Sequence, residues 1–138
     1  MEKIKVISVR PGQEPETIET ENEYENIRSL VCNAEDGYIE VVYPWEDPVA
    51  LICDEEGKIK GREANRILED ESGKAYDILV GPFLIVGLAG DSFASLPEEL
   101  IKKYTEKFRW PEYFYRWANQ LFVCTKRPGE EPRSLYRY

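Results

Sequence analysis

The longest apolar run of the chain, residues 76–88 (YDILVGPFLIVGL), limits the folds that it can adopt. Its length and its β-branched residues predict a buried strand, and Gly81-Pro82 predicts a break or an edge position within it. A buried strand needs neighbours in a sheet and cover on its faces. The fold is therefore expected to be built around a sheet that contains this run.

Shorter runs on both sides of this segment supply the neighbouring strands and two helices. The candidate strands are residues 3–10, 17–20, 38–43, 49–53, 58–60 and 121–125. Capping boxes begin the candidate helices, with Thr20 and Glu23 before the first and Ser95 and Glu98 before the second. We predict an α+β fold: a mostly antiparallel, curved sheet of about five or six strands with two amphipathic helices on one face. The predicted domain covers residues 1–127, and residues 128–138 form a polar C-terminal tail.

The sequence contains no histidine, which removes the commonest general base and the commonest transition-metal ligand in proteins. Adjacent carboxylates such as Asp54 and Glu55 point to opposite faces of a strand, and no third metal ligand has suitable spacing. The cysteines Cys32, Cys53 and Cys124 lie far apart, as is typical of reduced thiols in a core. We therefore expect a protein that is not an enzyme and needs neither metal nor cofactor.

The charge is unevenly distributed along the chain. The net charge is -9, but residues 109–138 hold six basic and three acidic side chains, a balance of +3. Residues 1–108 hold 12 basic and 24 acidic side chains, a balance of −12. A small anionic ligand can be attracted by the local excess, whereas duplex DNA would also meet the negative remainder. We therefore expect no direct binding of duplex DNA.

Residues 53–66 (CDEEGKIKGREANR) combine a turn with a polar segment. Residues 54–57 supply a hairpin turn in which Gly57 is free to take a positive φ, and Lys58 begins the return strand.

No run approaches the roughly 18 apolar residues of a membrane span, and the chain begins with a strand pattern rather than a signal sequence. We therefore expect a cytoplasmic protein without a membrane partner.

Asn65 and Arg66, which end the segment 53–66, allow two interpretations. An arginine fork and an amide together can hold a phosphate or read a base edge. Alternatively, Asn65 caps a short helical turn and Arg66 pairs with Glu69 or Asp70. On the first interpretation Lys58, Asn65 and Arg66 are ligand-binding residues.

Several blocks of the sequence resemble one family. Residues 37–43 (GYIEVVY), 50–58 (ALICDEEGK), 65–66 (NR) and 77–83 (DILVGPF) are similar to the family known as domain of unknown function 3846. The resemblance covers roughly residues 2–112. This family is widespread in phages and in mobile elements of bacteria, and it has no assigned activity or cofactor. The resemblance therefore implies a bacterial, mobile-element context but no chemistry.

The segment after the second helix is rich in rings and cations. Residues 110–117 (WPEYFYRW) contain five aromatic side chains. Flat rings stack on bases and cations pair with phosphates, although aromatic residues at this density are also typical of a core or a subunit interface. The candidate ligand-binding residues here are Arg109, Trp110, Tyr115, Arg116, Trp117 and Arg127.

Context and composition together suggest two functions. The first is a phage or mobile-element counter-defence protein that binds and sequesters a nucleotide-derived immune signal without cleaving it, in a pocket between the protomers of a homo-oligomer. The alternative is an acidic DNA mimic that inhibits a host restriction or CRISPR protein, although a solvated surface would show the same acidic pattern. The carboxylates of that alternative include Glu14, Glu16, Glu19, Glu21, Glu23, Glu25, Glu35 and Asp36. A third possibility is an intracellular accessory domain with a structural role.

Overall fold

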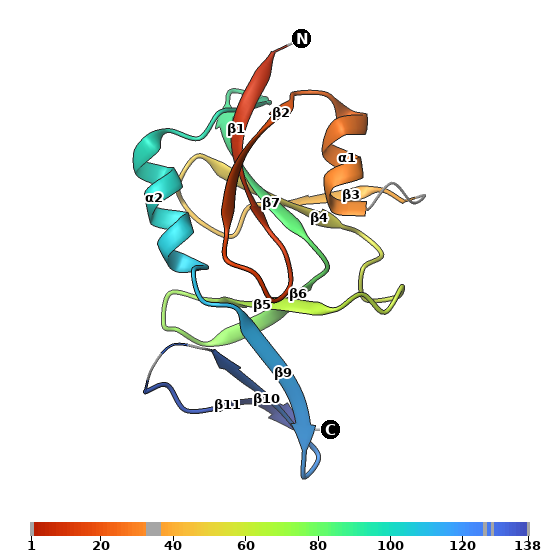
Figure 1. Ribbon diagram of the computed structural model, residues 1–138, viewed down its shortest axis with the longest axis vertical. Helices are drawn as coiled ribbons and strands as arrows, with labels where there is room; N and C mark the ends of the chain where they lie inside the picture. Colours follow the sequence, from red (N-terminus) through yellow and green to blue (C-terminus); the bar gives the residue numbers. More distant parts are fainter. Residues whose placement is uncertain (1, 33–36, 126, 128, 138) are drawn as a thin grey trace.

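A six-stranded antiparallel sheet forms the main body of the protein (Figure 1). The computed structural model describes residues 2–32, 37–125, 127 and 129–137. The strand order is β2-β1-β7-β4-β3, and β8 pairs with the end of β7. The strands are β1 (Lys3–Val9), β2 (Glu16–Glu21), β3 (Ile39–Val42), β4 (Val49–Asp54), β7 (Phe83–Ala89) and β8 (Ser92–Ala94). The predicted α+β class and the mostly antiparallel sheet are confirmed.

The two helices lie on opposite faces of this sheet (Figure 1). α1 (Tyr24–Cys32) covers one face and α2 (Glu98–Lys107) covers the other. On β4, Leu51 belongs to the core under α2, whereas Ala50 and Ile52 belong to the core under α1. The prediction that both helices cover one face is therefore wrong. Its physical reason is that β4 is buried on both faces, so each face needs its own cover.

Ser95 does not cap α2. Pro97 occupies the N-cap position, and no side chain bonds to the first turn of this helix. The Ser95 hydroxyl instead accepts a hydrogen bond from the Lys5 N–H at 2.9 Å. The Ser95 backbone also packs closely against Gly87, where a Cβ would lie 2.6 Å from the Ser95 carbonyl oxygen.

The apolar run of residues 76–88 breaks where the sequence predicted. Its first part lies in β6 (Ala75–Val80), which pairs with β5 (Ala64–Glu69), and its second part forms β7 of the main sheet. Gly81 lies between them with a φ of 71° and donates its N–H to the carbonyl of Glu63 at 2.8 Å. The run therefore serves two different sheets.

The return strand after the 54–57 turn begins later than predicted. Residues 55–61 form consecutive turns, and β5 starts only at Ala64. The positive φ of this segment belongs to Gly61, at 71°, and not to Gly57. β5 pairs with β6 rather than with β4, because the turns carry the chain away from the main sheet.

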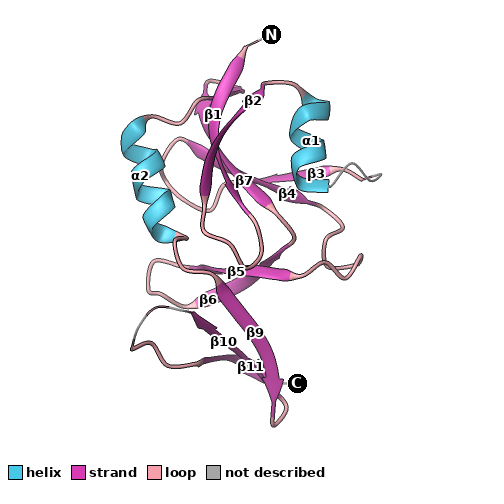
Figure 2. Cartoon of the chain, viewed as in Figure 1, coloured by secondary structure: helices cyan, strands magenta, loops and turns pink. Residues whose placement is uncertain are grey.

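A three-stranded sheet follows α2 and lies beyond the β5–β6 hairpin, at the end of the molecule opposite the N-terminus (Figure 2). Its order is β11-β10-β9. The strands are β9 (Glu112–Trp117), β10 (Gln120–Thr125) and β11 (Arg133–Arg137). Part of the expected polar tail therefore has regular structure, because β11 pairs antiparallel with β10.

Candidate functional site

Asn65 and Arg66 are fully buried at the start of β5. The Arg66 guanidinium donates to the carbonyl of Phe108 from Nη2 at 2.9 Å and from Nε at 3.2 Å. It also donates to the carbonyl of Gln13 at 2.7 Å and to Oδ1 of Asn65 at 2.8 Å. The Asn65 amide donates to the carbonyls of Val9 and Gly81. The pair therefore ties β5 to the β1–β2 loop and to the end of α2.

The burial of Asn65 and Arg66 bears on both the ligand-binding and the structural interpretation of these residues. A fully buried guanidinium whose donors meet carbonyls of its own chain presents no surface to a ligand in this structure. The partner expected in the structural alternative is also different, since Glu69 pairs with Arg133 at 2.7 Å. Asn65 lies in a strand and caps no helical turn.

Asp54 and Arg62 hold the polar segment that follows β4. The Asp54 carboxylate is buried and accepts hydrogen bonds from the Glu56 N–H at 2.9 Å, from Lys60 Nζ at 3.1 Å and from Arg62 Nε at 2.9 Å. Arg62 also donates to the carbonyl of Cys32 at the end of α1. Burial acts to raise the pKa of Asp54, but the Glu56 N–H and the Lys60 ammonium outweigh it and hold the pKa below its usual value.

Lys58 lies apart from this buried cluster. Its Nζ forms an exposed ion pair with Asp77 on β6 at 2.6 Å. Sequence reasoning selected Lys58 and missed Arg62 and Lys60, which make the buried contacts. The sequence signal that could have found Lys60 and Arg62 was one carboxylate at a strand end followed by cations six and eight residues later.

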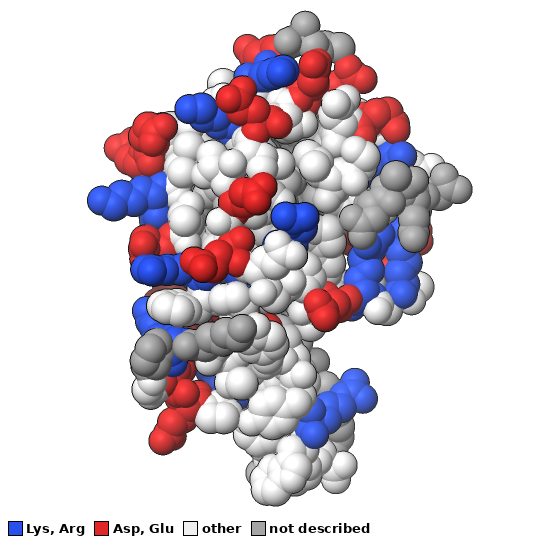
Figure 3. Space-filling view, in the orientation of Figure 1, with Lys and Arg blue, Asp and Glu red and all other residues white. Residues whose placement is uncertain are grey.

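Three aromatic side chains of β9 point to one face of the C-terminal sheet. Tyr113, Tyr115 and Trp117 alternate along the strand and are 38%, 41% and 70% exposed. Phe122 of β10 lies opposite Tyr115, with the two rings stacked at 5.4 Å between centroids. We call these four side chains the aromatic face. In Figure 3 this end of the molecule shows mostly uncharged surface, whereas charged side chains of both signs surround the opposite end.

The predicted cations do not lie on the aromatic face. Arg116 follows Tyr115 on β9 and therefore points to the opposite side of the strand. Arg109 precedes β9, with its guanidinium 5.1 Å from the ring centroid of the half-buried Trp110. The structure therefore brings Tyr115 and Trp117 together on one face but does not bring the predicted arginines to that face.

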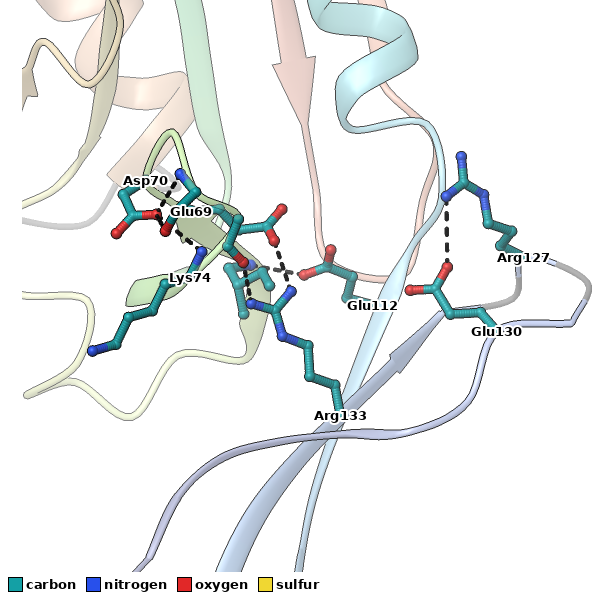
Figure 4. A network of polar contacts seen from close by, with 10 residues as sticks. Glu69, Asp70, Lys74, Glu112, Arg127, Glu130 and Arg133 are labelled. Carbon is teal, nitrogen blue, oxygen red and sulfur yellow. Dashed lines mark hydrogen bonds and ion pairs between the residues drawn. The ribbon is translucent and has the colours of Figure 1, made fainter.

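Arg127 lies in the β10–β11 connection. Its Nη1 is 3.7 Å from a carboxylate oxygen of Glu130, as Figure 4 shows. Both side chains are exposed, and an ion pair of this kind contributes little to stability. Lys58, Asn65 and Arg66 belong to other parts of the fold, so the nine candidate residues do not form one site.

Polar contacts join the C-terminal sheet to the β5–β6 hairpin (Figure 4). Glu112 accepts a hydrogen bond from the Ile67 N–H at 2.7 Å. Arg133 pairs with Glu69 and donates to the carbonyl of Gly73. Burial raises the pKa of Glu112 to about 7, although the Ile67 N–H and the charge of Arg66 oppose this rise.

The raised pKa predicts that Glu112→Gln stabilises the protein at alkaline pH. A carboxyl group whose pKa rises on folding binds more protons in the folded state, so stability falls as the pH climbs from 4.5 to about 7. Glutamine keeps an acceptor for the Ile67 N–H and has no charge to bury. We expect the free energy of unfolding at pH 8 to increase by about 2 kcal/mol.

Urea unfolding of both proteins at pH 4.5, 6 and 8 measures this effect. The gain should be small at pH 4.5, where the glutamate is protonated in the folded wild type and about half protonated in the unfolded wild type. Glu131→Gln, a change in an exposed residue of the same region, is the control. An unchanged pH slope in Glu112→Gln would contradict the prediction.

The acidic residues of β2 are partly neutralised by their neighbours. Glu19 and Glu21 lie directly opposite Lys5 and Lys3 on β1, as cross-strand pairs of opposite charge. Glu16 lies an odd number of residues from both and therefore points to the other face. Glu35 and Asp36, which belong to the same DNA-mimic hypothesis, lie outside the described residues. The geometry therefore gives no continuous row of carboxylates along this strand.

The sequence profile of the family described as "Domain of unknown function (DUF3846)" matches residues 4–109. The chain belongs to the DUF3846 family. This match confirms the resemblance seen in the sequence. Comparison with curated proteins and with solved structures found no match for the chain.

The DUF3846 region runs from β1 through α2 and ends before β9. It includes Asp54, Asn65 and Arg66, whereas the aromatic face lies beyond it. Of the helices that the described residues form, none is long and apolar enough to cross a membrane. Within the same part of the chain, no three His, Cys, Asp or Glu side chains are grouped closely enough to hold a metal ion.

Proposed function

We propose that this DUF3846 protein is a phage or mobile-element counter-defence protein that binds and sequesters a nucleotide-derived immune signal without cleaving it. The aromatic face is the binding surface in this proposal. The observation that carries it is the exposure of Tyr113, Tyr115 and Trp117 on one face of β9. Rings exposed in this way attract a flat partner that can cover them.

The spacing of these rings suits bases. Side chains two residues apart on a strand are about 6.6 Å apart, a spacing that lets neighbouring rings each take one base or share a base between them. Stacking of one base on an aromatic side chain contributes about 1 to 3 kcal/mol. Phe122 extends the platform on β10, because its ring lies beside Tyr115 on the same face and stacks with it.

The net charge of the C-terminal segment favours an anionic ligand. Residues 109–138 hold six basic and three acidic side chains. One of the three acids is Glu112, whose pKa of about 7 leaves it partly protonated near neutral pH. Arg109 and Arg133 pair with Glu106 and Glu69 outside this segment, so a modest excess of positive charge remains to attract phosphate groups.

Sequestration follows from mass action. A protein that binds the signal more tightly than the host receptor does lowers its free concentration without any chemical step. A second copy placed over the aromatic face would enclose the ligand and slow its release. This is the role we assign to the homo-oligomer.

Alanine substitution of Trp117 is expected to weaken ligand binding and to leave the fold intact. Trp117 is 70% exposed, so its removal should change the free energy of unfolding by less than about 0.5 kcal/mol. Loss of one stacking contact should weaken binding by about tenfold or more. Tyr38→Ala is the matched control, because Tyr38 is 68% exposed and belongs to the β3 side of the main body.

The measurement is a thermal-shift titration against cyclic dinucleotides, linear nucleotides and ADP-ribose derivatives. A ligand of the native state raises Tm in proportion to the logarithm of its concentration. We expect at least one member of the panel to raise Tm for wild type and Tyr38→Ala, and to raise it clearly less for Trp117→Ala at the same concentration. If no nucleotide raises Tm of the wild type, or if Trp117→Ala responds like the wild type, the proposal is wrong.

A further inference from the structure

A groove made of three cavities follows β6. Three adjoining cavities of about 1030, 470 and 310 Å³ form it, and Tyr76 lines all three. The largest lies between the β3–β4 loop, the β5–β6 turn and the last two turns of α2, and the others continue along β6. We call this feature the β6 groove. Its lining belongs to the DUF3846 region except for Leu135 of β11, which lines the smallest cavity, and none of the four side chains of the aromatic face lines it.

One wall of the groove is the edge of a sheet. Among the described strands, β6 pairs only with β5. The Ile78 N–H is directed away from β5 and donates to a carboxylate oxygen of the neighbouring Asp77 at 2.8 Å. A side chain therefore occupies the place that a further strand would take. Edges of this kind accept an extended segment of another chain.

Two exposed rings stand in the groove. Tyr43 and Tyr76 are 63% and 56% exposed, although both line the cavities. Trp45 packs against Tyr104, with 4.6 Å between ring centroids. The faces of such rings attract cationic side chains.

The charge of the groove has the opposite sign to that of a phosphate site. Five acidic and two basic side chains line the largest cavity. Asp47 and Glu69 are already paired, with Lys103 and Arg133. Glu46 and Glu71 have no ion-pair partner among the described residues. The groove therefore repels nucleic acid and attracts a positively charged partner.

We propose that the β6 groove binds an extended, basic segment of a partner protein. Arginine or lysine side chains of that segment lie over Tyr43 and Tyr76 and pair with Glu46 and Glu71. Its backbone runs beside β6, where its N–H and C=O groups replace the contact between Ile78 and Asp77. This proposal is independent of the nucleotide ligand, because it uses none of the residues of the aromatic face.

Two fluorescein-labelled decapeptides test the proposal. One alternates arginine with valine, and the other alternates glutamate with valine. Fluorescence anisotropy should show saturable binding of the arginine peptide and none of the glutamate peptide. Binding should weaken as salt rises, since ion pairs at an exposed groove are screened. If the arginine peptide does not bind, or if both peptides bind equally, the proposal is overturned.

Substitutions then locate the site. Tyr76→Ala and the double variant Glu46→Lys/Glu71→Lys should each weaken binding by about tenfold. The matched control is Glu19→Lys/Glu21→Lys, which changes the net charge equally on β2, outside the groove. Equal weakening by both double variants would mean that the peptide responds only to total charge, and would overturn the assignment. Trp117→Ala should bind the peptide like wild type, so failure of the nucleotide proposal is distinguishable from failure of this one.

Folding of the variants is checked independently. Tyr76 is exposed, so its loss should leave Tm close to that of the wild type. If Tyr76→Ala unfolds, Tyr43→Ala probes the same cavities from the β3–β4 side. Unchanged peptide affinity in a folded tyrosine variant would overturn the proposal.

Discussion

Arg66→Met is expected to lower the free energy of unfolding by about 3 to 5 kcal/mol. Methionine fills the space of the aliphatic part of arginine and needs no solvation, so the change removes a buried charge and leaves a smaller cavity than alanine would. It also removes every donor that meets the carbonyls of Phe108 and Gln13. Each buried acceptor left without a donor costs about 1 to 3 kcal/mol. The unsatisfied carbonyls therefore outweigh the relief of the buried charge.

Arg66→Lys separates charge from shape. A lysine ammonium keeps the positive charge but cannot reach the carbonyls of Phe108 and Gln13 with the geometry of a planar fork. We expect it to recover only part of the loss. Arg10→Met is the matched control, because Arg10 is exposed and its nearest carboxylate oxygen, on Glu16, is 3.9 Å away. That variant should change stability by less than about 0.5 kcal/mol.

Urea unfolding followed by tryptophan fluorescence measures all three variants. A lower midpoint with an unchanged m-value would show that Arg66→Met weakens the native state without changing its compactness. If Arg66→Met were as stable as the wild type, the hydrogen bonds to Phe108 and Gln13 would not be what holds β5 in place.

Asp54→Ala is expected to cost about 3 kcal/mol. The Asp54 carboxylate is inaccessible to solvent and bonds Lys60 and Arg62 directly. Its removal leaves two cations close together without their counter-charge, and it frees the Glu56 N–H. It also loosens Arg62 from the Cys32 carbonyl, so the end of α1 should become less well held.

The pH dependence of Asp54 has the opposite sign to that of Glu112. A carboxyl group whose pKa falls on folding stabilises the protein above its unfolded pKa, and this contribution is lost as the pH falls through the folded pKa. The gap between the wild type and Asp54→Ala should therefore be full at pH 7 and shrink below pH 3.8. Guanidinium unfolding at pH 3 and pH 7 measures it.

Glu25→Gln is the control for Asp54→Ala. Glu25 pairs with Arg28 one turn along α1 and is 66% exposed, so the change should cost less than about 0.5 kcal/mol. An equal loss in the two variants would mean that the buried position of Asp54 has no special effect.

The strands and helices follow from local patterns, and the sequence could therefore predict them. The run of residues 76–88 indicated buried strands and a break at Gly81, because β-branched content and a Gly-Pro pair act over a few residues. To predict that the two helices cover opposite faces of the sheet, one further inference was needed. Every residue of β4 is buried, and a strand without a polar face requires cover on both sides.

The role of Arg66 could not be predicted in the same way. Its partners are 53 and 42 residues away in the sequence, so no local pattern separates a buried structural arginine from a ligand-binding one. The aromatic segment was predictable in part, since strict alternation placed Tyr115 and Trp117 on one face once β9 was known to be a strand. The β6 groove was not, because it is lined by three segments that only the tertiary fold brings together.

The short link between β6 and β7 couples the alignment of two sheets. Only Gly81 and Pro82 separate these strands, and Gly81 is bonded through its N–H to Glu63 and through its carbonyl to Asn65. Because side chains alternate along a strand, a slip of one residue in β6 would pull β7 by the same amount. The residues of β7 that fill the core under α1 would then turn toward α2. The hairpin and the main sheet can therefore reach their native pairing only as one unit.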